Sequence, residues 1–500
     1  MKCRRGSLIF HINSFKKYLS GLRLKFLILV FYVILSSISF TSLAKGVSPY
    51  LPLQLDPTVE LEIQRLATVA KLPLLTKPYH IATVHRYLKK ISRSHPTLYN
   101  RLNKYMKRYK KSAAITHAKA EISYANIENV LLANQRGQML DANYNVSLNG
   151  FWQANEYMIV NGGGRYYENG DYIGNSFVSL GWDFFQVDIG YREHWISPFQ
   201  DGAVLLSTAA KPPVNVTISN PTLLTDFNIK YEMSIGILET HEGIQFDRDE
   251  PPVSGEPALL MMHLSAQPFD WWTIGLNRTF QFGGDESVTL SDIWQAIIDP
   301  VNADNCGGNG TELQDCSQEF GNQQASITNK FDVSLFDIPF SMYYEYAGED
   351  TNNYTNYRLA NLANSFGVFF PYLSDSMALN IEFTTFQKAW YTHHIYAEGY
   401  SNDGVKMGHW WGNMKNPKDG IGGESGSVRF DWQLQNDAQL TILYRTANFN
   451  ESRYEEYNLS HDVELKYVKA LGVAFLGVTI QAGETNLGDT YARSSVSYTW

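Results

Sequence analysis

The strongest constraint on the fold is an alternation of apolar and polar residues with a period of two, which runs from about Thr116 to Trp500. Segments of about ten residues show it, for example Ala142–Trp152, Phe184–Trp195 and Tyr491–Trp500. Successive side chains of a β-strand point to opposite faces, so this period predicts strands with one apolar face. Aromatic residues gather near the segment ends, as in the girdles of a membrane barrel. The chain is therefore predicted to be mainly β.

The composition agrees with a barrel that exposes apolar side chains to lipid and polar ones to its interior. Only 44% of the residues are hydrophobic, yet 14% are aromatic. The alternative is a soluble β-sandwich, which would leave open sheet edges that need protection. Closure removes those edges, and a membrane-spanning sheet must close because lipid offers no hydrogen bonds. We therefore predict a transmembrane β-barrel.

The alternation divides into eighteen segments, which predicts an 18-stranded antiparallel barrel over residues 114–500. The predicted strands are 116–126, 141–152, 156–166, 173–181, 184–194, one within 203–219, 226–237, 257–266, 271–282, 326–336, 338–347, 364–371, 377–388, 425–434, 438–447, 461–470, 472–482 and 491–500. Short connections such as 267–270 alternate with long ones such as 283–325 and 389–424, as periplasmic turns and extracellular loops do. With an even number of strands, the chain enters the first strand and leaves the last strand on the same side, which is the periplasmic side.

Residues 1–44 have the pattern of a signal peptide. Seven basic residues precede an uncharged apolar run over 26–43, and the small residues Ser42 and Ala44 fit a cleavage site. The alternative is a retained anchor, since about 18 apolar residues can just span a bilayer. We place the cut after Ala44, which leaves 34 basic and 50 acidic residues and a net charge of −16.

Residues 45–113 are predicted to form a periplasmic helical bundle. Asp56 can cap a helix, and apolar residues then recur at helical spacing up to Lys111. The breaks fall at Pro73, Pro78 and Pro96. Thirteen basic and three acidic residues lie between Asp56 and Lys111, so this unit is strongly basic. We expect it under or inside the periplasmic mouth of the barrel.

Two interpretations of the basic helices remain open. Their cations could receive an anionic polymer or a periplasmic partner, or they could dock the helices electrostatically to an acidic barrel mouth. The residues concerned are Lys89, Lys90, Arg101, Lys104, Lys107, Arg108, Lys110 and Lys111. Nucleic acid is not an expected partner, because a secreted protein rarely meets it.

The C-terminal residues and the cysteines add two expectations. Val496, Tyr498 and Trp500 alternate with polar residues and end the chain on an aromatic, an ending that outer-membrane insertion machinery typically reads. Outer-membrane lipid is then the other expected partner of the barrel. After Cys3 leaves with the signal peptide, Cys306 and Cys316 bracket a Gly/Asn-rich stretch, which predicts a disulfide in an oxidising compartment. Two cysteines are too few for a structural zinc site.

Four strings of the chain resemble the Wzi-type capsule assembly family of the outer membrane. They are SPYLPLQ (Ser48–Gln54), Arg192–Pro221, YYEYAGED (Tyr343–Asp350) and YAEGYSNDGVKMGHWWGN (Tyr396–Asn413). The resemblance implies an eighteen-stranded barrel with a periplasmic helical bundle, occluded by its extracellular loops. It also implies a lectin that tethers capsular polysaccharide to the cell surface. The insertion His241–Glu256 and the cysteine loop are local elaborations that leave the identity of the glycan open.

The long loop 391–423 is the candidate polysaccharide-binding site. Sugar rings pack on flat aromatic faces, and exposed loops make such faces available. We expect Trp410 and Trp411 to form a stacking platform, with Asp403 and Asn413 holding hydroxyl groups. Tyr400 and His409 complete the candidate set in this loop. The alternative is a loop that folds inward and plugs the barrel with its own aromatics, and the two interpretations are compatible.

Arg192 is the remaining candidate, at the outer end of the fifth predicted strand. It could pair in bidentate fashion with a glycan carboxylate, or with an acidic neighbour across the lumen. The acidic candidates are Glu345, Glu349 and Asp350, which could equally bind a divalent cation. No calcium-loop spacing is present, so no metal or cofactor is predicted.

The sequence predicts no catalytic residues. His393 and His394 lie near serines, but a Gly-x-Ser-x-Gly nucleophile elbow is absent. Acidic residues are so abundant on the loops that a glycosidase pair would not stand out. We therefore expect a non-enzymatic surface lectin that anchors capsular or exopolysaccharide. The alternative is a diffusion porin, which would differ in having an open lumen.

Overall fold

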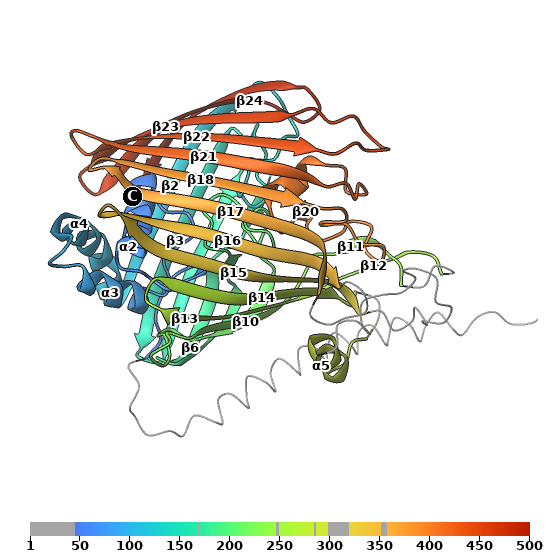
Figure 1. Ribbon diagram of the computed structural model, residues 1–500, viewed down its shortest axis with the longest axis horizontal. Coiled ribbons are helices and arrows are strands. Elements are labelled where there is room, and N and C mark those ends of the chain that lie inside the picture. The colour runs from blue at the N-terminus through green and yellow to red at the C-terminus, as the bar shows by residue number, and fades with distance from the viewer. Residues whose placement is uncertain (1–45, 169, 247–249, 285–286, 299–319, 352–357) are drawn as a thin grey trace, which may run out of the picture. The chain divides into compact units, whose positions relative to one another are not determined.

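The strands form a closed antiparallel barrel in the computed structural model (Figure 1). The structure describes residues 46–500 apart from 169, 247–249, 285–286, 299–319 and 352–357. The strands are β2 (Ala113–Ala125), β3 (Tyr144–Asn155), β4 (Met158–Tyr167), β5 (Gly170–Tyr172), β6 (Ser176–Trp182), β7 (Phe185–Tyr191), β9 (Val214–Ser219), β10 (Lys230–Ile237), β13 (Ala258–Phe269), β14 (Trp272–Phe282), β15 (Gly321–Leu335), β16 (Ile338–Thr351), β17 (Leu359–Ser374), β18 (Met377–Phe386), β21 (Gly423–Leu434), β22 (Ala438–Phe449), β23 (Ser460–Leu471), β24 (Ala474–Glu484) and β25 (Thr490–Thr499).

Eighteen strand positions make the barrel, as predicted. The short strands β5 and β6 both pair with β4 and share one position. The barrel closes where β2 pairs with β25, with Ile122 opposite Val496. Each predicted segment overlaps one strand position, and several strands, such as β15 and β17, extend beyond the predicted bounds. The prediction of an 18-stranded antiparallel barrel is confirmed.

The two faces of the wall differ in polarity. Ile122 on β2 leaves 74% of its surface exposed, and Leu148 and Tyr498 are also exposed on the outer face. Ser147 and Ser497, their neighbours along the strands, are buried on the inner face. An apolar outer face and a polar interior are the arrangement of a transmembrane barrel. Within the described ranges, no helix is long and apolar enough to cross a membrane.

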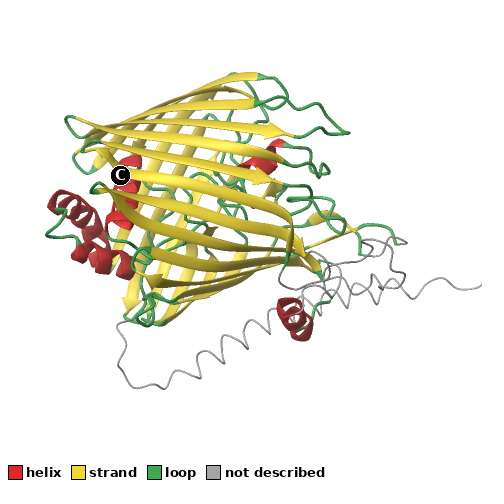
Figure 2. Ribbon diagram, viewed as in Figure 1, coloured by secondary structure: helices red, strands yellow, loops and turns green. Residues whose placement is uncertain are grey.

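The barrel has two distinct ends. At the helix end, short turns such as 270–271, 336–337 and 472–473 connect neighbouring strands, and the helices within residues 57–110 lie there as well (Figure 2). The long connections gather at the loop end. Among them are 126–143, 192–213, 238–257, 387–422 and 450–459, whereas the connection 220–229 lies at the helix end. Apart from 220–229, this alternation of short and long connections follows the predicted pattern.

The helices are α2 (Pro57–Val69), α3 (Ile81–Lys90), α4 (Pro96–Met106) and the 3₁₀ helix η1 (Lys107–Lys110). Asp56 caps α2 by accepting a 3.0 Å hydrogen bond from the Thr58 N–H. Helix α2 lies inside the barrel, where Arg65 Nε donates to the Pro371 carbonyl at 2.9 Å. The other helices pack on α2 through an apolar core. The predicted helical unit thus sits both inside and under the helix end.

The N-terminal segment meets a loop from the opposite end in the middle of the barrel. Strand β1 (Thr76–Lys77) pairs with β8 (Trp195–Ile196), and β8 belongs to the loop 192–213. Gln64 Nε2 on α2 also donates to Gln200 Oε1 of that loop at 2.6 Å. Residues 46–500 therefore form one compact unit. The predicted signal peptide, 1–44, and the predicted disulfide between Cys306 and Cys316 lie outside the described residues.

Candidate functional site

Three loops fold into the barrel and fill its loop end. They are 126–143, 192–213 and 387–422, which we call the loop-end plug. Backbone hydrogen bonds join them: the Arg136 N–H donates to Thr208 O at 2.9 Å, and the Ser207 N–H donates to Met407 O at 2.8 Å. Tyr391 lies at the centre, where its hydroxyl donates to Val204 O at 2.7 Å and accepts from the His409 N–H at 2.9 Å. The lumen at this end is therefore occupied by protein.

Trp411 is fully buried, with an exposed fraction of 0%. Its indole stacks on Phe386 with centroids 4.5 Å apart and on Phe449 with centroids 5.2 Å apart. Trp410 is also buried, and its indole N–H donates to Asp201 Oδ2 at 3.2 Å. The prediction of an open stacking platform is wrong for this conformation, because neighbouring rings already cover the indole faces. The inward-folding alternative describes the loop.

Three other predicted residues shape the loop from within. His409 Nδ1 accepts from the Trp411 N–H at 3.1 Å and so caps the 3₁₀ helix η3 (Trp410–Met414). Burial lowers the pKa of His409 to about 4, so the ring is neutral and can accept this bond. Asn413 Oδ1 accepts from the Lys406 N–H at 2.7 Å, and its amide donates back to Lys406 O. Tyr400 is buried against Tyr391.

Close packing around Tyr391 explains why glycine occupies two positions in this loop. A Cβ atom at Gly408 would come within 2.3 Å of the Tyr391 ring, and one at Gly412 within 2.4 Å. Either side chain would displace the ring from the centre of the plug. The loop is therefore built around Tyr391 rather than around a ligand-sized opening.

Asp403 is the predicted residue that remains at the surface. Its side chain is 53% exposed and accepts a 2.8 Å hydrogen bond from Lys211 Nζ, on the neighbouring loop, with which it forms an ion pair. Asp403 has a φ of 52° at the tip of the hairpin formed by β19 (Ser401–Asn402) and β20 (Val405–Lys406). Sequence reasoning did not find Lys211, because it lies 192 residues from Asp403 in the chain.

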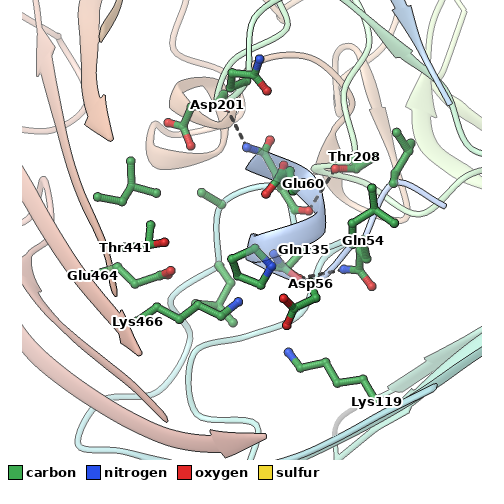
Figure 3. A pocket seen from close by; sticks show the side chains of 18 of the residues that line it. Gln54, Asp56, Glu60, Lys119, Gln135, Asp201, Thr208, Thr441, Glu464 and Lys466 are labelled. Carbon is green, nitrogen blue, oxygen red and sulfur yellow. Dashed lines mark hydrogen bonds between the residues drawn. The ribbon is translucent and has the colours of Figure 1, made fainter. Parts of the chain in front are cut away.

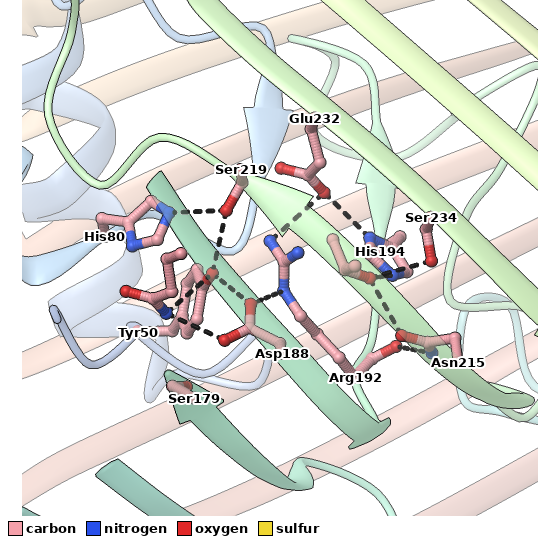
Figure 4. Close-up of polar contacts among 12 residues, drawn as sticks. Tyr50, His80, Ser179, Asp188, Arg192, His194, Asn215, Ser219, Glu232 and Ser234 are labelled. Atoms are coloured by element: carbon pink, nitrogen blue, oxygen red, sulfur yellow. Dashed lines mark hydrogen bonds and ion pairs between the residues drawn. The ribbon is translucent and has the colours of Figure 1, made fainter. Parts of the chain in front are cut away.

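Arg192 is buried in a polar cluster rather than presented to solvent (Figure 4). Its guanidinium lies 3.5 Å from Asp188 and 3.2 Å from Glu232, and over the Tyr50 ring at 4.5 Å. The prediction of an acidic partner is right in kind, but among the described side chains the partners are Asp188 and Glu232 rather than Glu345 or Glu349. The glycan-carboxylate role of Arg192 is contradicted by this burial.

A second buried ion pair closes the plug next to this cluster. Arg136 donates to Glu193 at 2.5 and 2.9 Å, and the Tyr172 hydroxyl donates to the same carboxylate at 3.1 Å. Burial alone would raise the pKa of Glu193, but the Arg136 guanidinium outweighs it and holds the pKa below its usual range. The pair fixes the loop 126–143 to the end of β7.

A cavity of about 290 Å³ remains in the lumen between α2 and the wall formed by β2 and β21 to β25 (Figure 3). Ion pairs join opposite sides of it: Arg429 with Glu60 at 3.0 Å and Arg445 with Asp201 at 2.7 Å. Lys466 also faces the space. The cavity is polar enough to hold water. In the part of the chain that the structure describes, no group of His, Cys, Asp or Glu is placed to hold a metal ion.

The basic helices attach to the barrel mainly through apolar contacts. Ile81, Val84, Leu98 and Leu102 pack in a core that includes Phe151 of the wall. Arg101 pairs at 3.0 Å with Glu62, which belongs to α2 and not to the wall. Six lysines, Lys89, Lys90, Lys104, Lys107, Lys110 and Lys111, are exposed. Electrostatic docking to the barrel mouth and binding of a partner therefore both stay predictions for these cations.

The chain is similar to known outer-membrane proteins in sequence and in fold. The family model described as capsule assembly protein Wzi matches residues 98–495. The solved structure of Wzi from Escherichia coli, an outer membrane protein involved in group 1 capsule assembly and described as a carbohydrate-binding β-barrel, is 16% identical. The match covers 89% of this chain and 98% of that one, with a TM-score of 0.66. OccK5 of Pseudomonas aeruginosa is 9% identical over 78% of this chain and 96% of its own, with a TM-score of 0.47. No curated protein matches the chain by sequence.

Proposed function

Because the chain belongs to the Wzi family of capsule assembly proteins, we propose that it is a non-enzymatic outer-membrane lectin that holds capsular or exopolysaccharide at the cell surface. The observation that carries this proposal is the filled loop end, where three loops occupy the lumen and leave polar tips at the surface. A channel needs an open lumen, whereas a surface anchor needs a rigid platform. The solved relative described as a carbohydrate-binding β-barrel agrees with this choice.

The orientation in the membrane follows from the two ends. Outer-membrane barrels have short periplasmic turns and longer extracellular loops. The loop end accordingly faces outward, and helices α2, α3 and α4 face the periplasm. Trp500 directly follows β25, and its N–H donates to Ala118 O at 2.8 Å across the barrel closure. Insertion machinery that reads this ending would thus act on the strand that completes the barrel.

The glycan contacts are proposed at the exposed tips of the plug loops. Asp403 and Lys211 offer a carboxylate and an ammonium side by side, and such groups hydrogen-bond sugar hydroxyls. Tyr454, on the loop 450–459, is 63% exposed and offers an aromatic face. The buried residues Trp411, His409 and Asn413 act as positioning residues, because they hold the loop that carries Asp403.

The test is retention of polysaccharide on cells that lack the protein. Complementation uses the wild type, an Asp403→Ala, Lys211→Ala double variant, and Lys104→Ala as a matched helix-end control. We expect the null strain to make its glycan but shed it, and the double variant to restore retention poorly at equal abundance. Full restoration by the double variant would show that the glycan contacts lie elsewhere on the loop end. Normal retention by the null strain would overturn the anchoring function.

A further inference from the structure

The loop between β14 and β15 carries a short helix, α5 (Leu290–Ile298), on the outside of the barrel (Figure 1). Its residues Ile293, Ala296 and Ile297 pack on the outer face of the wall. The wall residues in that contact are Leu260 and Met262 of β13 and Phe280 and Phe282 of β14. Outward-facing side chains of a membrane barrel normally meet lipid, so α5 replaces lipid over this patch.

Both ends of α5 are fixed. At the N-terminus, Asp292 Oδ2 accepts from the Thr289 N–H at 2.8 Å, and the Thr289 hydroxyl accepts from the Asp292 N–H at 3.3 Å, which is a capping box. At the C-terminus, Arg278 of β14 donates to Ile297 O at 2.8 Å and to Ala296 O at 3.3 Å. A cation at this end is favoured by the helix dipole. The helix is thus a fixed part of the wall.

One of the two sides of α5 that do not contact the wall is apolar. Leu290, Trp294 and Ile298 are 83%, 63% and 58% exposed, and their four-residue spacing places them on one stripe. The helical period puts the polar residues Ser291, Asp292 and Gln295 together on the remaining side. The helix therefore has a wall side, an apolar side and a polar side. This division is typical of a helix that lies in the plane of a membrane surface.

The apolar stripe continues the lipid-facing band of the barrel. On the outer face, Leu264 pairs with Leu276 one step toward the helix end from the pair formed by Met262 and Arg278. Leu264 and Leu276 are both exposed. The cover provided by α5 begins at Arg278, immediately beyond those exposed leucines. An arginine and a tryptophan at this level suit the boundary between acyl chains and water.

We propose that α5 is an in-plane membrane helix that inserts Leu290, Trp294 and Ile298 among the lipid acyl chains of the leaflet at the loop end. The helix fixes how deeply this side of the barrel sits in that leaflet. The inference rests on the packing and exposure of α5 and not on glycan binding, so it stands independently of the lectin proposal.

The test places a photoreactive benzophenone amino acid at position 294 in one variant and at position 295 in another. Both side chains are exposed, so both variants should assemble at wild-type abundance. After irradiation of whole cells, we expect a lipid adduct from position 294 and little or none from position 295. A dimer-sized product from position 294 would identify a second copy as the occupant and overturn the proposal. Equal lipid labelling at the two positions would also overturn it.

A second measurement does not depend on the cross-linker. Trp294→Asp and Gln295→Asp add the same charge to adjacent positions of α5. In lipid bilayers, a charge among acyl chains is unfavourable, so Trp294→Asp should lower the melting temperature while Gln295→Asp should leave it near the wild-type value. Equal shifts would show that the stripe does not face lipid.

Discussion

The two ends of the barrel are filled in different ways. The helix end is filled by one continuous segment, residues 46–106, in which amphipathic helices pack on each other and α2 reaches the wall through ion pairs such as Glu60 with Arg429. The loop end is filled by three loops that are far apart in the sequence and meet around buried aromatic rings. A continuous helical unit brings its own core, whereas the loop-end plug exists only when the barrel holds its three loops together.

This difference predicts unequal sensitivity to substitution. In the loop-end plug, one ring can carry contacts to two different strands, so its loss affects several connections at once. At the helix end, the polar contacts of residues 46–106 with the wall are distributed and partly exposed. The predictions below use the free energy of unfolding in detergent, measured by urea titration.

The largest effect is expected for Trp411→Ala. The substitution removes the ring that lies between Phe386 and Phe449, and loss of a buried tryptophan costs about 3–5 kcal/mol. Tyr454→Ala removes an exposed aromatic at the same end and serves as the control, with a change within about 0.5 kcal/mol. Similar values for the two variants would show that the plug does not depend on its buried rings.

The next largest loss of stability is expected for Arg192→Met, where the loop-end plug meets the N-terminal segment at Tyr50. The substitution leaves Asp188 and Glu232 buried without the guanidinium, and removing one partner of a buried pair costs about 3 kcal/mol or more. Lys230 and His194 still contact Glu232, which keeps the loss at the lower end of that range. Lys211→Ala breaks an exposed pair and should cost less than about 1 kcal/mol.

The fold was predictable where local pattern determines structure. In β25, Tyr491, Arg493 and Ser495 face inward and alternate with exposed residues, and the sequence shows that period directly. The helix ranges follow for the same reason, since Asp56 and the helical spacing are local signals. The acidic partner of Arg192 was also within reach, because alternation in β10 places Glu232 on the inner face with Lys230 and Ser234.

The candidate site was less predictable because burial in it depends on distant residues. Trp411 is covered by Phe386 from β18 and Phe449 from β22, and nothing in the sequence around Trp411 indicates those neighbours. Asp403, one hairpin away, is exposed. An aromatic-rich loop therefore predicts a functional region without showing which of its rings remain free.

Acid should loosen the loop-end plug. The folded protein lowers the pKa of His409 to about 4 by burial, while an unfolded histidine titrates near 6.5. Between these values the unfolded state binds a proton that the folded state does not, so stability falls as the pH is lowered from about 6.5 to 4. Protonation of Nδ1 would also remove its bond from the Trp411 N–H. Hydrogen exchange of the loop 387–422 at pH 7 and pH 5 measures the effect.

His409→Gln is the matched control for this pH dependence. Glutamine keeps a hydrogen-bond acceptor near the Trp411 N–H but does not titrate, so exchange of the loop should change less between pH 7 and pH 5. An unchanged acid response in this variant would assign the effect to another group. Exchange in α3 reports on the helix end, where burial likewise lowers the pKa of His80.

The smallest effect is expected for Glu60→Gln in α2, at the helix end. The substitution removes the 3.0 Å pair with Arg429, but Arg429 keeps its 2.9 Å pair with Asp431 on the same strand. The Glu60 side chain is 35% exposed, and partly hydrated pairs contribute about 1 kcal/mol or less. Asp431→Asn, which removes the more buried partner, should cost more than Glu60→Gln. If Glu60→Gln costs as much as Trp411→Ala, the helix end depends on single contacts as strongly as the loop end does, and the distinction between the two fillings fails.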